Sequence, residues 1–309
     1  MSAPPPVSNR RHLDESVMAL WLQRQALAAA PPWLHGEVAR RMAERLPVIR
    51  STPDTVAQWW AQTGASDALL QATYPKARRV LVEPTPTLQR RSEREATAPW
   101  WSARRWTLPA PQIIAEAELP AATVQLLWAN MMLHAVADPP ALMARWRRAV
   151  AVDGFLMFST LGPDTLIELR TLYRELGWGA MAPPFIDMHD LGDMLVQAGF
   201  ADPVMDQEKL VLTWATPEAM LAELRGLGGN ADPARHAGLR TPRWQRRLLD
   251  ALRERAGADG RVAQSFEIVY GHAFNPPPRH KVAAQTELPL ADLRSMVRAG
   301  ARTPRKPVA

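Results

Sequence analysis

The 309-residue sequence contains no cysteine, which excludes disulfides, thiolate nucleophiles, iron–sulfur clusters and cysteine-based zinc sites. The seven histidines are scattered, and none stands in the HxxxH or HxH spacing that is typical of metal ligands. We therefore expect no metal site. A cytoplasmic location is the simplest interpretation of a chain without cysteine.

Long apolar runs are also missing. Gln125, Asn130 and His134 interrupt the most hydrophobic region, so the sequence has no stretch of about 18 apolar residues that could span a membrane. The first residues, "MSAPPPVSNRRHLDE", contain no charged head followed by an apolar segment, so export is not expected either. An apolar fraction of 47% indicates a globular protein with a substantial core.

The formal net charge is +6, and arginine carries almost all of the positive charge. Such a balance favours acidic partners, which include nucleic acid, an acidic carrier protein and anionic substrates. The basic residues are dispersed through amphipathic segments such as "EVARRMAERL", and no aromatic and basic RNA-binding signature accompanies them. Nucleic acid is therefore not the expected partner.

From Val56 onward, short apolar runs alternate with helical segments. The runs cover residues 56–61, 79–83, 112–114, 124–130 and 154–160. Between the last two, "DPPALMARWRRAV" has prolines at its start and arginines in its last turn, as expected for a helix. Near-continuous apolar strands that alternate with helices predict a doubly wound, mostly parallel sheet covered on both faces.

The rest of the chain is assigned around this sheet. Residues 14–46 have helical spacing, "PVMDQEKLVLTW" and "FEIVYGHAF" are strand-like, and residues 217–259 between these two strands predict a helical cap over a site. We expect one domain over residues 14–300. The Pro- and Arg-rich segments 1–13 and 301–309 are predicted to be disordered tails.

Several phrases in the second half resemble a known family. "LLWANMMLHAVADPPALMARWRRAVAVDGFLMFSTLGPDTLIELR" looks like the fourth strand, helix and fifth strand of class I S-adenosylmethionine-dependent methyltransferases. "FSTLGPDTLIELR", "FIDMHDLGDMLVQAGFADPVMD", "AMLAELRGLGGN" and "EIVYGHAF" resemble the malonyl-[acyl-carrier protein] O-methyltransferases of biotin synthesis. The resemblance runs from about residue 112 to residue 274. It implies a Rossmann-like seven-stranded sheet, S-adenosylmethionine as cofactor and acyl-carrier protein as partner.

The cofactor loop departs from the family. The resemblance places V-L-D-x-G-x-G-T-G on "VAQWWAQTG", so Gln58 stands for the family's Asp, and Trp60 and Gln62 stand for its first two glycines. Only Thr63 and Gly64 agree. Glycines there let the backbone turn sharply and approach the cofactor closely, which a side chain obstructs. Either the cofactor is excluded, or the loop swings outward and Trp60 packs inside the domain.

Other cofactor contacts implied by the resemblance are partly present. Glu83 ends the second strand and matches the acid that accepts hydrogen bonds from ribose hydroxyls, although a solvated strand end is the alternative. The adenine-contacting acid falls near Ala115, and the adjacent Glu116 is the candidate to replace it. Asn130 matches a residue that lines the cofactor pocket, with capping of the next turn as the alternative.

The substrate pocket is expected at the carboxyl ends of the strands. The phrase "STLGPDT" is interpreted as the loop after the fifth strand, so Ser159, Thr160 and Gly162 are predicted to face that pocket. His134 is a further candidate, with packing or capping as its alternative role. A cation should hold an acid group of the substrate, and Arg145, Arg147, Arg225 and Arg243 are equally plausible.

Two functional hypotheses follow. Methyl transfer to a carboxylate needs alignment and a dry pocket more than acid or base catalysis, so the absence of a catalytic dyad does not argue against it. The first hypothesis is an S-adenosylmethionine-dependent O-methyltransferase acting on a carrier-bound acyl carboxylate. The alternative is a degenerate member that keeps the fold without binding the cofactor and acts as a binding, scaffold or regulatory protein.

Overall fold

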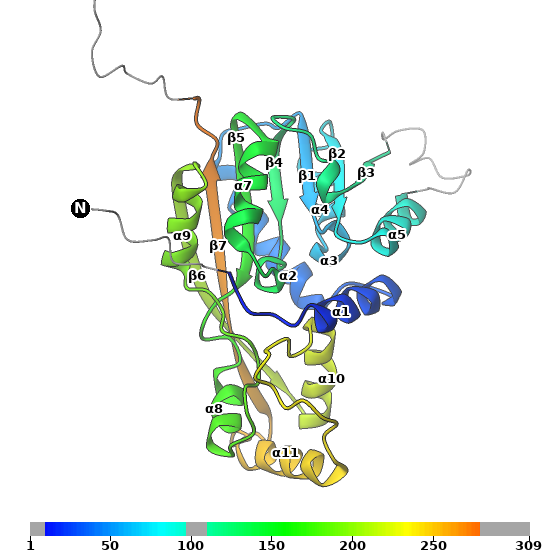
Figure 1. Ribbon diagram of the computed structural model, residues 1–309, viewed down its shortest axis with the longest axis vertical. Coiled ribbons are helices and arrows are strands. Elements are labelled where there is room, and N and C mark those ends of the chain that lie inside the picture. The colour runs from blue at the N-terminus through cyan, green and yellow to red at the C-terminus, as the bar shows by residue number, and fades with distance from the viewer. Residues whose placement is uncertain (1–9, 97–109, 279–309) are drawn as a thin grey trace, which may run out of the picture. The chain divides into compact units, whose positions relative to one another are not determined.

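Seven strands form one sheet in the computed structural model, which describes residues 10–96 and 110–278. The strands are β1 (Thr55–Trp59), β2 (Arg78–Glu83), β3 (Gln112–Ala115), β4 (Val124–Ala129), β5 (Val150–Leu161), β6 (Ala201–Trp214) and β7 (Val262–Phe274). Their order across the sheet is β3-β2-β1-β4-β5-β7-β6 (Figure 1). This seven-stranded, mostly parallel sheet confirms the predicted doubly wound, Rossmann-like α/β fold class.

The strands β1 to β5 run parallel to one another. The strand β7 pairs antiparallel with both β5 and β6. The apolar runs are buried on both faces, as the burial of all five β1 residues illustrates. Parallel strands of this kind bring their carboxyl ends to one edge of the sheet, where α/β proteins bind ligands.

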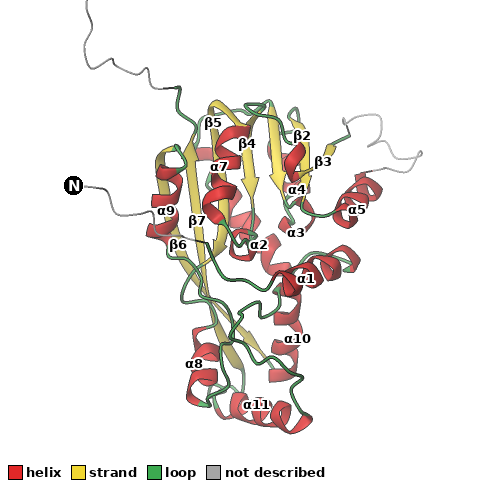
Figure 2. Ribbon diagram, in the orientation of Figure 1, coloured by secondary structure: helices red, strands yellow, loops and turns green. Residues whose placement is uncertain are grey.

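Helices cover both faces of the sheet (Figure 2). They are α1 (Glu15–Leu27), α2 (Trp33–Ala43), α3 (Ala61–Gly64), α4 (Asp67–Thr73), α5 (Pro86–Ala96), α7 (Pro139–Ala149), α8 (Ile167–Glu175), α9 (Met188–Gln197), α10 (Pro217–Leu227) and α11 (Pro242–Glu254). Apolar residues of α7 and α9 pack in one core and those of α2 and α4 in the other, so the sheet lies between two apolar layers.

The cap is built on the long strands β6 and β7. These strands extend past the carboxyl ends of the parallel strands, and α8, α10 and α11 surround the extension (Figure 1). The helices α10 and α11 correspond to the helical cap predicted over residues 217–259. Figure 1 also shows α1 between the carboxyl ends of β1 and β2 and the cap helix α10.

Two strand boundaries differ from those predicted. The first run was expected to be a strand over residues 56–61, but β1 ends at Trp59 because Trp60 adopts a left-handed conformation. The strand β5 is longer than expected and continues to Leu161, because β7 pairs with it along this stretch. The predicted tail over residues 301–309 and the domain end at 300 lie outside the described residues and stay predictions, as does the tail over residues 1–13.

Candidate active site

The loop after β1 lies at the carboxyl edge of the sheet, beside the ends of β2 and β4. Trp60 has φ 54° and ψ 54°, and its backbone N–H donates to Val82 O at 2.7 Å. This left-handed conformation costs an ordinary residue roughly 1–2 kcal/mol, whereas glycine adopts it freely. The backbone at position 60 therefore has the conformation that the family's glycine favours, although the residue there is tryptophan.

The Trp60 indole points into the domain, and only 6% of the residue is exposed. Its ring lies 6.3 Å from that of Trp21 on α1, and its Nε1–H donates to Glu116 Oε1. The second Glu116 oxygen pairs with Arg145 at 3.0 Å. The predicted packing of Trp60 inside the domain is therefore confirmed, while the predicted outward swing of the loop stays a prediction.

Glu83 ends β2 and is 1% exposed. Its Oε1 accepts hydrogen bonds from the Gln62 backbone N–H at 3.0 Å and the Ser92 hydroxyl at 2.8 Å, while its buried Oε2 has no hydrogen-bond partner among the described residues. Burial raises the pKa of Glu83 to about 7, although the bonds from Ser92 and Gln62 oppose this shift. The carboxyl group thus faces the loop, and the alternative of a solvated strand end is wrong.

Asn130 follows β4 and is completely buried. Its Nδ2 donates to His35 O at 2.8 Å and Gly64 O at 2.7 Å, and its Oδ1 accepts from Ser159 Oγ at 2.6 Å. A Cβ added to Gly64 would make only an ordinary contact, at 3.6 Å, with Asn130 O. Gly64, Asn130 and Ser159 are therefore brought together, and their hydrogen bonds connect α2, the loop after β1, β4 and β5.

His134 lies in the short 3-10 turn η3 (Leu133–Ala135) that follows β4, and it borders a cavity of about 510 Å³. Its Nδ1 is buried without a hydrogen-bond partner among the described residues. Burial, with smaller contributions from His35 and Arg11, lowers the pKa of His134 to about 3. The imidazole is therefore neutral at neutral pH.

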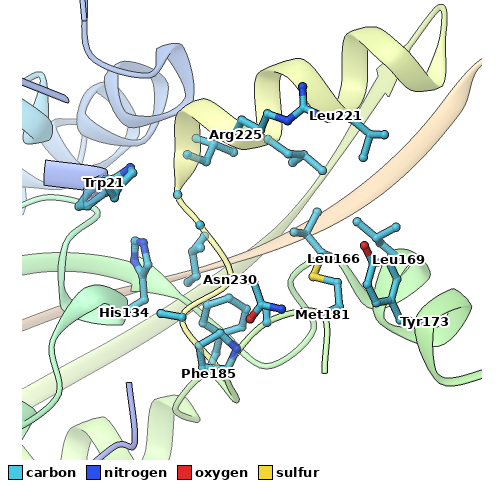
Figure 3. A pocket seen from close by; sticks show the side chains of 18 of the residues that line it. Trp21, His134, Leu166, Leu169, Tyr173, Met181, Phe185, Leu221, Arg225 and Asn230 are labelled. Atoms are coloured by element: carbon cyan, nitrogen blue, oxygen red, sulfur yellow. The ribbon is translucent and has the colours of Figure 1, made fainter. Parts of the chain in front are cut away.

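The cavity lies between the end of β4, α8 and the cap. Figure 3 shows His134 and Trp21 on one side, Leu169 and Tyr173 on the opposite side, and α10 above them. The apolar lining includes Leu161, Leu166, Leu169, Met181, Phe185, Leu221, Leu224, Leu248 and Phe266. A concave, mainly apolar space with a few polar groups is typical of a site for a small molecule.

Arginine also reaches this cavity. Arg225 on α10 and Arg240 border it, and Arg240 donates to Trp178 O at 2.6 Å. Arg225 is exposed and forms no ion pair with the residues that the structure describes. The cavity therefore combines an apolar wall with a cation that is available to an acidic ligand.

The predicted substrate loop is the main correction. Ser159 and Thr160 are not loop residues but lie within β5, paired with Tyr270 and Val269 of β7, and are buried at 0% and 2% exposure. Both belong to the sheet because β7 extends the pairing beyond the last apolar residue of the run. Their predicted place in a loop is wrong, whereas a pocket role for them stays a prediction.

Gly162 comes directly after β5 and lies against the antiparallel neighbour strand. A Cβ at this position would come within 2.5 Å of Glu267 Cδ, so a larger residue would require the Glu267 side chain to shift. The cavity lining instead includes Leu161 and Leu166 on either side of it. A pocket role for Gly162 stays a prediction.

The four candidate arginines lie in different surroundings. Arg145 pairs with Glu116 near Trp60, and Arg147 donates to Gly199 O at 2.9 Å. Arg225 is at the cavity, and the lining does not include Arg243. The geometry therefore favours Arg225, and it adds Arg240, which the sequence analysis did not consider.

The sequence analysis also missed Trp21. This residue borders the cavity and contacts Trp60, although its segment was expected only to be helical. Its position in an N-terminal helix gives no signal of a site, since aromatic residues on helices usually pack in a core. Within residues 10–96 and 110–278, no cluster of three or more His, Asp or Glu side chains is arranged to hold a metal ion, and no helix is long and apolar enough to cross a membrane.

Comparisons with known proteins bear on this geometry. No protein-family model matches the chain. The solved structure of YcgJ from Bacillus subtilis superimposes with a TM-score of 0.52 at 10% identity, covering 77% of this chain and 99% of that protein, so it supports the fold alone.

Curated relatives show the family to which this chain belongs. A malonyl-[acyl-carrier protein] O-methyltransferase from Laribacter hongkongensis is 39% identical over 257 residues, which cover 81% of this chain and 86% of the relative. An enzyme of the same name from Gallionella capsiferriformans is 36% identical over 277 residues, covering 86% of this chain and 94% of the relative. The predicted resemblance is confirmed, and this chain belongs to the malonyl-[acyl-carrier protein] O-methyltransferase family.

Proposed function

We propose that this chain methylates the free carboxylate of a malonyl group carried on acyl-carrier protein, using S-adenosylmethionine, as a step of biotin synthesis. The relatives at 36–39% identity support this substrate. The main structural support is the cavity of about 510 Å³ beside the end of β4. That edge of the sheet is where α/β folds of this kind bind their ligands.

Methyl transfer to a carboxylate requires little acid or base catalysis. A carboxylate is already ionised near neutral pH, so it would accept the methyl group that bound S-adenosylmethionine supplies without proton transfer. The chain contributes alignment and exclusion of water, which the leucine side chains of α8 and α10 provide in the cavity. A neutral His134 offers the acyl group a hydrogen bond without a competing charge.

The basic groups support an acidic, carrier-bound substrate. Arg225 is exposed at the cavity, where it is placed to meet the phosphate of a carrier's prosthetic arm or an acidic carrier helix. The net charge of +6 favours association with an acidic carrier protein. We propose a cytoplasmic location for this partnership, because the chain contains no cysteine.

Gly64, Glu83, Glu116 and Asn130 are the residues proposed to meet the cofactor, and the free Glu83 Oε2 has the chemistry to accept a ribose hydroxyl. In this conformation the buried Trp60 indole bonds to Glu116 Oε1 and the Gln62 backbone bonds to Glu83 Oε1. An adenosyl group that contacted these two oxygens would have to displace both donors.

The second candidate function is a chain that binds carrier-linked acyl groups in the cap cavity without methylating them. The relatives, which are named as methyltransferases, support the enzyme.

The test is to incubate the purified chain with malonyl-[acyl-carrier protein] and S-adenosylmethionine and to measure the intact carrier by mass spectrometry. We expect a carrier heavier by one methyl ester, and rescue of a biotin auxotroph that lacks this methyltransferase. Acetyl-[acyl-carrier protein], which has no free carboxylate, is the matched control. Saturable binding of the malonyl carrier without ester formation would contradict the enzyme and support the second candidate.

A further inference from the structure

The residues that replace the family's glycines engage the acids of the cofactor crevice. Trp60 donates from Nε1 to Glu116 Oε1, and Gln62 donates from its backbone N–H to Glu83 Oε1. The Gln62 side chain adds a bond from Nε2 to Glu95 Oε2 at 2.8 Å. Both candidate nucleoside-binding acids are thus held by a loop only three residues long.

The indole has the chemistry of the ligand that it displaces. It is a flat aromatic ring with an N–H donor, like a purine base with its exocyclic amine, and it donates to a carboxylate oxygen near the end of β3. Arg145 completes the arrangement, because it pairs with the other Glu116 oxygen at 3.0 Å. Trp60 is therefore placed as an internal substitute for the adenine base.

A second indole lies over the first. Trp21 is 3% exposed, its ring is 6.3 Å from that of Trp60 at an interplanar angle of 39°, and its other side borders the cap cavity. The helix that carries it is attached to the cap, since Gln25 Nε2 donates to Gly226 O at 2.9 Å. Trp21 thus lines the cavity and contacts Trp60, and Trp60 bonds to Glu116.

We infer that Trp60 determines whether the crevice accepts an adenosyl ligand, which binds only after the indole has left its place between Trp21 and Glu116. The affinity for that ligand is then lowered by the fraction of molecules in which the crevice is open. This inference rests on the proposed use of an adenosyl cofactor.

The experiment is calorimetric titration of the full chain with S-adenosylhomocysteine. Trp60→Gly removes the indole and suits the backbone at φ 54°, so we expect binding at least about tenfold tighter than that of the unaltered chain. Ala65→Gly is the matched control, because Ala65 also has φ 54° in the same loop but does not fill the crevice. This control relieves backbone strain alone and should leave the affinity unchanged.

Equal affinity in Trp60→Gly and Ala65→Gly, or no binding by any variant, would overturn the inference. If Trp60→Gly does not fold, 19F NMR of the unaltered sequence labelled with fluorotryptophan replaces it, with Trp60→Phe identifying the resonance of position 60. A Trp60 resonance that stays unshifted when S-adenosylhomocysteine saturates the chain would also overturn it. Tighter binding by Trp60→Gly without any methyl ester would support this inference and contradict the proposed function, so the two failures are distinguishable.

Discussion

The two halves of the carboxyl edge of this sheet differ in what fills them. At the ends of β1 and β2 the chain packs Trp60 and Trp21 against each other and bonds its own donors to Glu83 and Glu116. On the cap side, past the end of β4, about 510 Å³ stays open among apolar side chains. The half expected to bind the cofactor is closed, while the half expected to bind the substrate is open.

The difference follows the sequence resemblance. The phrases that agree with the family lie from residue 112 onward and include parts of α8, α10 and β7, which surround the cavity. The loop from Gln58 to Gln62 departs from the family, and it lies at the closed half. Family membership thus describes the fold and the open half well, whereas the properties of the closed half depend on two glycine replacements.

The largest loss of stability is expected when the hydrogen bonds that connect the two halves are removed. Asn130→Ala removes three buried hydrogen bonds, those with His35 O, Gly64 O and Ser159 Oγ, while Gly64 O still accepts from Ser66 Oγ and Ser159 Oγ still accepts from the Met131 N–H. We expect the free energy of unfolding to fall by about 3 kcal/mol in a urea titration, since each buried hydrogen bond contributes about 1 kcal/mol. Asn230→Ala, which loses a bond to Ala180 O at 2.7 Å and a bond from the Asp232 N–H at 3.0 Å, should cost about 1–2 kcal/mol because both bonds are only part-buried. Equal losses would contradict the connecting role of Asn130.

Filling the open half should abolish its function without touching the closed half. Leu221 on α10 borders the cavity, and Leu221→Trp places an indole there, so we expect ester formation on the malonyl carrier to fall about 100-fold through loss of substrate positioning. Leu239→Trp is the control, because Leu239 is 98% exposed and lies outside the lining. Unchanged ester formation by Leu221→Trp would place the substrate elsewhere.

The sequence predicted the sheet and the cap because both depend on local patterns and on phrases shared with a family. The runs ending at Glu83 and beginning at Val124 became β2 and β4. The burial of Ser159 could not be predicted, because it results from pairing with Tyr270, more than a hundred residues later in the chain.

The contacts of Trp60 were beyond prediction for the same reason. The sequence shows an indole at a glycine position and therefore predicts a conflict with the cofactor. Whether the ring turns inward depends on Trp21 and Glu116, which come from distant segments. Local propensity contains no information about such tertiary partners.

The burial of Glu83 at the closed half predicts a pH dependence of stability. The pKa of Glu83 is raised to about 7 by burial, so the folded state disfavours its ionised form, and its contribution to the free energy of unfolding decreases as pH rises from about 4.5 to about 7. Glu83→Gln does not titrate, yet it keeps an oxygen for Gln62 and Ser92. The stability of the variant relative to the unaltered chain should therefore increase by on the order of 2 kcal/mol between pH 4.5 and pH 8 in urea titrations. Parallel pH profiles would contradict a buried, unpaired carboxyl oxygen.

The smallest expected effect concerns the boundary between the halves. Gln25 is buried on α1 and donates to Gly226 O on α10, so Gln25→Ala removes one bond between the helix that carries Trp21 and the cap. We expect a loss of about 1 kcal/mol in the free energy of unfolding, together with faster amide exchange along α1, because one part-buried bond contributes about that much. Arg253→Ala is the control, since its ion pairs with Glu218 and Asp250 are exposed and lie at the far end of the cap. Faster exchange in α1 for both variants would mean that α1 responds to general loosening of the cap, whereas an effect confined to Gln25→Ala would identify this bond as what holds Trp21 over Trp60.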